Sequence, residues 1–450
     1  MTTEQDILAD LARLQELLQG DDIQPAIDLL DGMHPADQAD LYEALDEDDQ
    51  PKVLALLSGE CIAHLLSHLE DEQRRSVVDK MPRATLARVL DASDFDVAVD
   101  ILHSIPPAEA VMTLSQMHTA AEVTPLLAHA DESAGGLMTR GYIAVHRDMT
   151  AGEVIDFLRA TKPAAEEAYY LYVLDAANHL EGVVNLRQLI VSAPETRLED
   201  VMEREPIAVA VESDQEEAAN LMQHYRLRSL PVVDEAGVLS GVITSDDIID
   251  VIQDEATEDM YYIAGLPGDD SLQAPLQLSA RKRIPWLMVS LATSFMAGAV
   301  VALFEGTIEQ AAALVVFMPI IAAQSGSAGI QTVTIVVRGI ALHELEAAEA
   351  WRVLRKEIAL GVIRGVLFGV LVGAAAYLWQ GEPAWGLVVG GAMLLNMIVA
   401  GLLGMLIPMT LRALKFDPAI ASGILLVSFT DILGFLMLLG FGALAIDQLT

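Results

Sequence analysis

Five long apolar runs in the C-terminal part of the chain restrict its fold more than any other feature. Each reaches the roughly 20 residues that a helix needs to cross a bilayer. In order, they are about Ile284–Phe304, Ala311–Ile340, Ile358–Trp379, Trp385–Leu411 and Ile420–Ile446. The sequence therefore predicts an α-helical membrane domain with five transmembrane helices over residues 284–450.

Basic residues predict how these spans are oriented. Arg281-Lys282-Arg283 precede the first span, and further Lys and Arg residues follow the second and fourth spans. The alternate loops and the C-terminal tail contain none. Because Lys and Arg concentrate in cytoplasmic loops, residues 1–283 are predicted to be cytoplasmic and Thr450 to lie outside. We expect a multi-pass protein of the inner (plasma) membrane.

Two polar features interrupt the apolar spans. The second span contains a glycine-rich stretch from Gln324 to Thr332, where irregular backbone is tolerated only against protein or a water-filled path. The fifth span contains Asp431, and a carboxylate in hydrocarbon is costly enough to indicate a function. The alternative for Asp431 is a protonated, hydrogen-bonded structural acid. The functional interpretation makes Asp431 a candidate cation ligand.

The charge of the chain is segregated. Residues 1–280 hold 55 acidic and 16 basic side chains and carry the whole formal charge of −39, whereas residues 281–450 hold ten of each. A nucleic-acid partner is not expected, because phosphate repels such an acidic body. The acidity favours a protein that handles cations, with solubility or adaptation to high salt as the alternative. The single cysteine, Cys61, excludes a thiolate metal site within one chain.

The cytoplasmic part divides by pattern into an array and a duplication. Residues 1–130 repeat apolar residues every three to four positions, with breaks at prolines, which predicts an all-α helical-repeat domain. Residues 131–198 and 199–256 each predict strand, helix, strand, strand, helix. Asp175 and Gly182 in the first half match Asp234 and Gly241 in the second, both seven residues apart. The predicted fold of these halves is α/β.

The duplicated halves resemble a tandem pair of CBS domains. The second half carries that family's Gly-x-x-Thr-x-x-Asp as Gly241, Thr244 and Asp247. The resemblance implies binding of ATP or another adenine nucleotide between the halves, with Thr244 and Asp247 on the ribose and phosphates.

The first half departs from that motif. It has Asn185 and Gln188 at the equivalent positions, so at most one nucleotide site of the usual kind is expected. Tyr170 and Arg187 are candidates to assist that site.

An acidic stripe follows the second half. Its members fall at i, i+3, i+7 and i+11 of a predicted helix, and two further acids flank them: Asp247, Asp250, Asp254 and Glu258, with Glu255 and Asp259. Like charges at this spacing destabilise a helix by a few tenths of a kcal/mol per pair. Bridging by hard cations such as Mg²⁺ or Ca²⁺, which take oxygen ligands, would offset that cost. Acids elsewhere are candidate partners in the bridging: Asp214, Glu216, Asp96 and Asp100. A solvated acidic face is the alternative.

Signatures of catalysis are missing from the sequence. It has no Walker A loop, no Gly-x-Ser-x-Gly and no His-Glu-x-x-His. The chain is therefore predicted not to be an enzyme, and pumping by ATP hydrolysis is not expected.

The order of these parts resembles the MgtE family of magnesium channels and transporters over essentially the whole chain. The resemblance is carried by Glu132–Thr139, Asp254–Asp259, Asp417-Pro418-Ala419 and Asp431, which matches the family's pore aspartate. It implies a homodimer with one ion path on its axis, lined by the second and fifth spans. It also implies that cytosolic Mg²⁺ holds the pore shut, with a connecting helix, residues 257–283, transmitting that state.

Two departures from the family pattern lie in the expected pore lining. Ser327 stands where the family usually has asparagine, and Ile424 stands at a proline position. We therefore expect a divalent-cation channel for Mg²⁺, with transport of another divalent ion such as Co²⁺ as the first alternative. The second alternative is a membrane-anchored nucleotide sensor that transports nothing.

Overall fold

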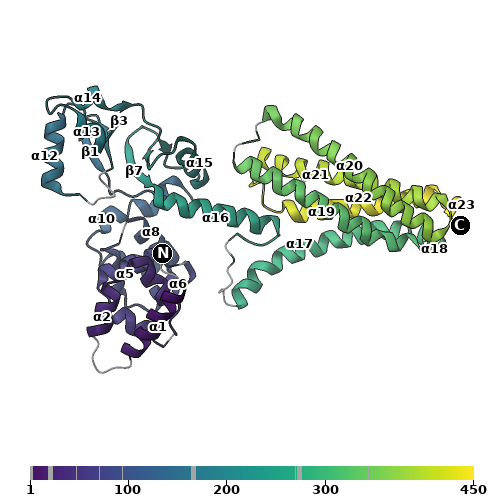
Figure 1. The fold of residues 1–450 in the computed structure, drawn as a ribbon, viewed down its shortest axis with the longest axis horizontal. Helices are drawn as coiled ribbons and strands as arrows, with labels where there is room; N and C mark the ends of the chain where they lie inside the picture. The colour runs from purple at the N-terminus through teal and green to yellow at the C-terminus, as the bar shows by residue number, and fades with distance from the viewer. Residues whose placement is uncertain are drawn as a thin grey trace. The chain divides into compact units, whose positions relative to one another are not determined.

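The chain forms two compact units, Met1–Ile252 and Gln253–Thr450 (Figure 1). The computed structural model describes residues 4–18, 24–46, 48–69, 71–93, 95–163, 169–268, 270, 276–342, 344–345 and 347–449.

The first unit begins with a helical array. Its elements are α1 (Glu4–Leu18), α2 (Gln24–Asp31), α3 (Pro35–Glu43), α4 (Gln50–Leu56), α5 (Gly59–His68), α6 (Asp71–Lys80), α7 (Arg83–Leu90), α8 (Phe95–Ser104), α9 (Pro107–Leu114), α10 (Ala120–Val123), the 3₁₀ turn η1 (Leu126–Ala128) and α11 (Ala134–Leu137). Prolines start α3 and α9, where the missing N–H costs nothing. In the described part of residues 1–130 all regular elements are helical, as predicted.

Two α/β halves complete the first unit. The first contains β1 (Ile143–His146), α12 (Ala151–Thr161), β2 (Tyr170–Leu174), β3 (Leu180–Asn185), α13 (Leu186–Val191), α14 (Leu198–Val201) and β4 (Glu203–Arg204). The second contains β5 (Val209–Ala210), α15 (Gln215–Tyr225), β6 (Ser229–Val233), β7 (Leu239–Thr244) and the start of α16 (Ser245–Ile263), whose residues from Gln253 onward belong to the second unit. The sheet orders are β1-β2-β3-β4 and β5-β6-β7, each with one parallel pair followed by antiparallel pairing. The predicted fold class is confirmed.

The duplication extends to single hydrogen bonds. Asp175 Oδ1 accepts the N–H groups of Ala177 and His179, and Asp234 Oδ1 accepts those of Ala236 and Val238. Each aspartate thus closes the turn between the last two long strands of its half, which explains the shared spacing to the following glycine.

In the part of the chain that the structure describes, five helices of the second unit are long and apolar enough to cross a membrane: α17 (Leu276–Leu303), α19 (Leu314–Ala341), α20 (Ala347–Gln380), α21 (Pro383–Ala413) and α22 (Ser422–Leu444). The short helix α18 (Glu305–Gln310) lies between α17 and α19, and the short helix α23 (Ile446–Leu449) follows α22. Helix α19 stays α-helical through the polar stretch of the second span, so the backbone there is regular.

Glycines allow α20 and α21 to pack closely. A Cβ on Gly369 would lie 2.8 Å from the carbonyl oxygen of Gly390, and one on Gly373 would lie 2.6 Å from that of Gly386. Both distances are too short for a real side chain, so this contact requires glycine, as small residues do in helix pairs in lipid. The glycines spaced every four residues along the third span thus face the fourth span.

The segment between the α/β halves and the first span differs from the sequence expectation. Helix α16 ends at Ile263, Gly265 takes a positive φ of +76°, and α17 begins at Leu276. Residues 257–283 are therefore not one connecting helix, because a glycine in the left-handed region stops the helical turn. The end of α16 packs on the membrane helices, where Tyr262 and Ile263 join a cluster with residues of α19 and α22.

Candidate functional site

Asp431 lies on α22 and is half-buried in the single chain. Helix α22 packs against α19, α21 and α17. One turn before Asp431, Ser428 donates a hydrogen bond to Thr293 of α17 over 2.7 Å. The predicted pore carboxylate therefore lies on a helix that packs against three of the other four spans.

The polar stretch of the second span divides between two faces of α19. Gln324, Ser327 and Gln331 are exposed in the single chain, and Thr334 continues this exposed row one turn later. The remaining hydroxyl groups, on Ser325 and Thr332, are buried at 0% and 1% exposure. One face of the helix thus has polar groups to offer water or a partner, while the other is packed inside the bundle.

The buried face of α19 makes polar contacts that the sequence reasoning missed. Asn396 of α21 donates to Ser325 over 2.8 Å, and Thr332 donates to Glu357 of α20 over 2.8 Å. Arg364, for which the sequence indicated no role, donates to the carbonyl of Ala328 at 3.4 Å. The signal for Asn396 and Glu357 was present, since each is a polar residue in or beside an apolar run.

The acidic stripe lies on the helix predicted for it. Asp250 and Asp254 of α16 are exposed, and Asp247, Glu255, Glu258 and Asp259 are half-buried. Among the residues that the structure describes, no three His, Cys, Asp or Glu side chains come together as ligands for a metal ion. The stripe therefore supplies single carboxylates and pairs.

Asp259, near the end of α16, forms a pair of acids with Asp417. Burial raises the pKa of Asp259 to about 6, and the nearby charges of Asp417 and Glu258 add to that rise. Glu258 lies over Gly268, where a Cβ would come within 2.5 Å of its side chain. Asp417 belongs to a motif noted in the sequence but was not among the candidate ligands. Acids that repel one another in this way form a place where a cation would be stabilised.

The candidate partners in the first unit have local roles. Asp214 caps α15 by accepting the N–H of Glu216, and Asp100 lies 3.8 Å from the guanidinium of Arg74. The Glu216 side chain is half-buried. The side chain of Asp96 falls outside the described residues.

The candidate nucleotide residues of the second half form a helix cap. Asp247 accepts both the hydroxyl and the N–H of Thr244, at 2.6 and 3.3 Å. In the first half, Asn185 and Gln188 form a full capping box at the start of α13, in which each side chain accepts the backbone N–H of the other residue. The motif spacing therefore serves helix capping in both halves. Tyr170 begins β2 opposite Asn185, and Arg187 is exposed.

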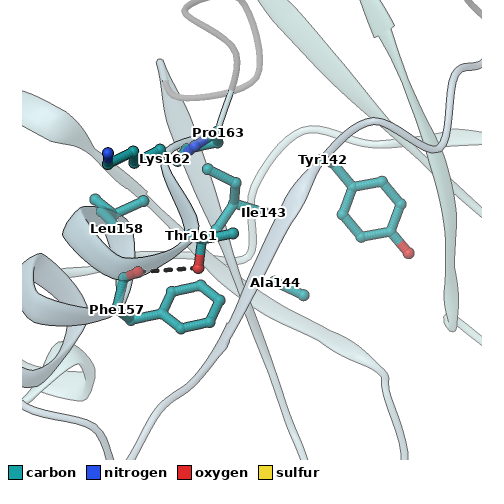
Figure 2. Close-up of a pocket in the computed structure, with 8 residues that line it drawn as sticks. All are labelled: Tyr142, Ile143, Ala144, Phe157, Leu158, Thr161, Lys162 and Pro163. Atoms are coloured by element: carbon teal, nitrogen blue, oxygen red, sulfur yellow. Dashed lines mark hydrogen bonds between the residues drawn. The ribbon is translucent and has the colours of Figure 1, made fainter.

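A pocket of about 420 Å³ opens on the first α/β half, between β1 and α12. Figure 2 shows its lining residues, among them Tyr142, Ile143 and Ala144 from the β1 region and Phe157 and Thr161 from α12. Its lining includes none of Tyr170, Arg187, Thr244 and Asp247. The four candidate residues thus lie outside the pocket.

Comparison with known proteins gives the family. Residues 318–441 match the family profile described as "Divalent cation transporter", residues 33–132 match the MgtE intracellular N domain, and residues 134–194 and 198–254 match the CBS domain. The magnesium transporter MgtE of Thermus thermophilus is 35% identical over 96% of this chain and 98% of its own length. That of Bacillus subtilis is 30% identical over 98% of both chains.

The chain belongs to the MgtE family. Its family is one of transporters and not of enzymes. A solved structure of the cytosolic domain of the Mg²⁺ channel MgtE in complex with ATP is 38% identical, with a TM-score of 0.51. It covers 54% of this chain and 99% of that one.

Proposed function

We propose that this MgtE-family protein is a homodimeric magnesium channel of the cell membrane, closed by Mg²⁺ bound at its acidic cytoplasmic domains. Asp431 would hold a largely hydrated ion in the pore. Because the interior of a cell is negative, a divalent ion gains about 4.6 kcal/mol per 100 mV on moving inward, so this flow needs no ATP hydrolysis.

The exposed polar row on α19 carries this proposal. Side-chain amides such as those of Gln324 and Gln331 are costly to expose to lipid, so their face has to meet water or protein. Two chains related by a twofold axis would place two such rows and two Asp431 carboxylates around one path. A membrane-anchored nucleotide sensor would need no such row.

The end of α16 supports gating from the cytoplasmic side. It packs on α19 and α22, and Gly423 of α22 approaches the carbonyl of Ile263 so closely that no side chain would fit there. The Asp259 and Asp417 pair lies in the same region, and the charge of Asp417 destabilises the Asp259 carboxylate. Mg²⁺ bound there would remove this repulsion and hold the α16 end on the bundle. By linkage, rising Mg²⁺ would favour the closed state.

Acids further along the chain extend this mechanism. We propose that Asp247, Asp250, Asp254 and Glu255 bind additional ions with carboxylates of other domains, among them Asp214, Glu216, Asp96 and Asp100. An adenine nucleotide at the α/β halves would be a second regulator, held by Thr244 and Asp247 with Tyr170 and Arg187. The complex of the related MgtE cytosolic domain with ATP supports the proposal that a nucleotide binds here.

A flux assay in liposomes tests the transport function. Purified full-length protein is reconstituted, and the uptake of Mg²⁺, Co²⁺, Ca²⁺ and Na⁺ is compared under an inside-negative potential. Mg²⁺ uptake is expected to exceed the others. Uptake of Co²⁺ alone would make the protein a transporter of a different divalent ion. No uptake of any ion, with nucleotide binding intact, would favour the sensor.

Neutralising the stripe tests the gating. Asn and Gln in place of the α16 acids are expected to remove both the inhibition of flux by millimolar Mg²⁺ and the protection of the cytoplasmic part from proteolysis. The matched control neutralises Asp46 and Asp48, exposed acids of the helical array. If the neutralised channel closes at the wild-type Mg²⁺ concentration, the stripe is a solvated face and the sensor lies elsewhere.

A further inference from the structure

Asn396 is a fully buried amide near the middle of α21, in the interior of a span. Its Nδ2 donates to Ser325 Oγ over 2.8 Å, and Ser325 in turn donates to the carbonyl of Ile321. The amide thus reaches from the fourth span to the polar stretch of the second span. A hydrogen bond between two fully buried groups in this environment has no water to compete with it.

The same amide also touches the fifth span. A Cβ on Gly434 of α22 would lie 2.5 Å from Asn396 Nδ2 and 3.3 Å from Ile321 Cγ2. Only glycine leaves room for the amide at this position. Gly434 follows Asp431 by three residues, which is about one helical turn. Asn396 therefore lies between the turn that carries the proposed pore carboxylate and the helix that carries the polar row.

Packing alone does not account for an asparagine here. Among the described residues, the Oδ1 atom of Asn396 is buried without a hydrogen-bond partner. Leaving such an acceptor unpaired is unfavourable, and a leucine would fill similar volume without that cost. The cost is offset if the donor side of the amide fixes a geometry on which transport depends.

We propose that Asn396 is a positioning residue for ion selection. Its amide bonds Ser325 of α19 on one side and occupies the space left by the missing side chain of Gly434 on the other, a space that we call the Gly434 notch. These two contacts set the distance between the polar row of α19 and Asp431. This inference rests on the proposed transport function. Under this inference Asn396, which is not part of the exposed polar row, influences the affinity and selectivity of the ion path for Mg²⁺.

The experiment uses full-length protein in liposomes and four substitutions. Asn396→Leu removes the amide, Ser325→Ala removes its acceptor, and Gly434→Ala occupies the notch. Gly440→Ala is the matched control on the same helix, because a Cβ there would meet nothing within 4 Å. For each protein, Mg²⁺ uptake is measured against external Mg²⁺, the Mg²⁺-to-Co²⁺ uptake ratio is determined, and Tm is recorded.

Displacement of a binding group by a fraction of an ångström to an ångström is expected to change the half-saturating Mg²⁺ or the uptake ratio by roughly tenfold. Asn396→Leu and Gly434→Ala should both do so, and Gly440→Ala should not. Adding Ser325→Ala to Asn396→Leu should have no further effect, since the bond is already gone. Ser325→Ala, which deletes one oxygen, keeps the test informative if the leucine variant fails to fold.

The outcomes separate the two proposals. If the variants lower Tm and maximal uptake but leave the half-saturating Mg²⁺ and the uptake ratio at wild-type values, Asn396 is only structural and the inference is overturned. If the wild-type protein carries no divalent ion at all, the proposed function fails, and the inference falls with it.

Discussion

The two units treat polar side chains in opposite ways. In the first unit, carboxylates are numerous, and those at turns and helix ends bond nearby backbone N–H groups, as Asp175, Asp214 and Asp234 do. In the membrane helices, exposed hydroxyl groups such as that of Thr410 bond to their own helix, but buried polar groups also bond across helices, as Asn396 does to Ser325 and Thr332 to Glu357. These carboxylates of the first unit thus fix local geometry, whereas these buried polar groups of the membrane helices join segments that are far apart in the sequence.

The largest expected effect concerns Asp431, the carboxylate in the fifth span. Asp431→Ala should reduce Mg²⁺ uptake by about a hundredfold, equivalent to about 2.7 kcal/mol, because the path loses its charged ligand. The dimer should persist on size exclusion. Asp447→Ala, which removes an acid from α23 outside the spans, is the control and should transport normally. Wild-type uptake by Asp431→Ala would end the pore assignment.

The next prediction tests the hydrogen bond between Thr332 of α19 and Glu357 of α20, which joins two membrane helices. Thr332→Val should lower the free energy of unfolding by about 1–3 kcal/mol, because the carboxyl of Glu357, 4% exposed, loses its donor. Thermal unfolding in detergent measures the effect. Thr410→Val is the control, since Thr410 is exposed and bonds only to a carbonyl of its own helix. Equal changes in the two variants would contradict a role for the bond across helices.

In the first unit, Asp91 is one carboxylate that departs from this contrast, because it joins segments that are far apart in the sequence. It accepts the N–H groups of His118 and Thr119 and the Thr119 hydroxyl. Asp91→Ala should cost about 1–2 kcal/mol, whereas Glu235→Ala, at an exposed turn, should cost less than about 0.5 kcal/mol. Hydrogen exchange of residues 107–123 in the full-length protein locates the loss.

The same group gives a pH test. Burial opposes the charged form of Asp91, but the hydrogen bonds from Thr119 and His118 outweigh it and lower the pKa to about 2. A lowered carboxyl pKa stabilises the fold above the unfolded value near 3.8 and loses that contribution as pH falls toward 2. Asp91→Ala should therefore flatten the pH dependence of unfolding between pH 4 and pH 2. An unchanged slope in that window would contradict the assignment.

The smallest expected effect concerns the acid pair at the end of α16. Because the pKa of Asp259 is raised to about 6, folding favours its protonated form. The fold is thus more stable below pH 3.8 and loses this contribution as pH rises through about 6. Without Mg²⁺, Asp417→Asn should reduce that loss by a few tenths of a kcal/mol.

Thermal unfolding at pH 5 and pH 8, with and without Mg²⁺, checks this prediction. Asp250→Asn, an exposed acid earlier on the same helix, is the control and should leave the difference between the two pH values unchanged. Wild-type behaviour of Asp417→Asn would show that the two carboxylates do not interact in solution.

The sequence by itself determined the elements and their classes. Apolar runs of at least 20 residues have few alternatives to membrane helices, so the five spans were predictable to within a few residues at most ends. The repeat of Asp175 and Gly182 as Asp234 and Gly241 indicated the duplication, because a turn of fixed length needs the same residues each time it occurs. The acidic stripe of α16 followed from helical spacing alone.

The tertiary structure decided which polar residues meet. Asn396 and Ser325 are 71 positions apart, and no local rule relates them. The structure also showed that Thr244 and Asp247 cap α16, a role that the same spacing permits as readily as ligand binding. It divided the polar stretch of the second span into an exposed row and a buried one, which requires knowledge of the neighbouring helices. Pairwise contacts of this kind depend on how helices pack, and the sequence pattern of one helix does not contain that information.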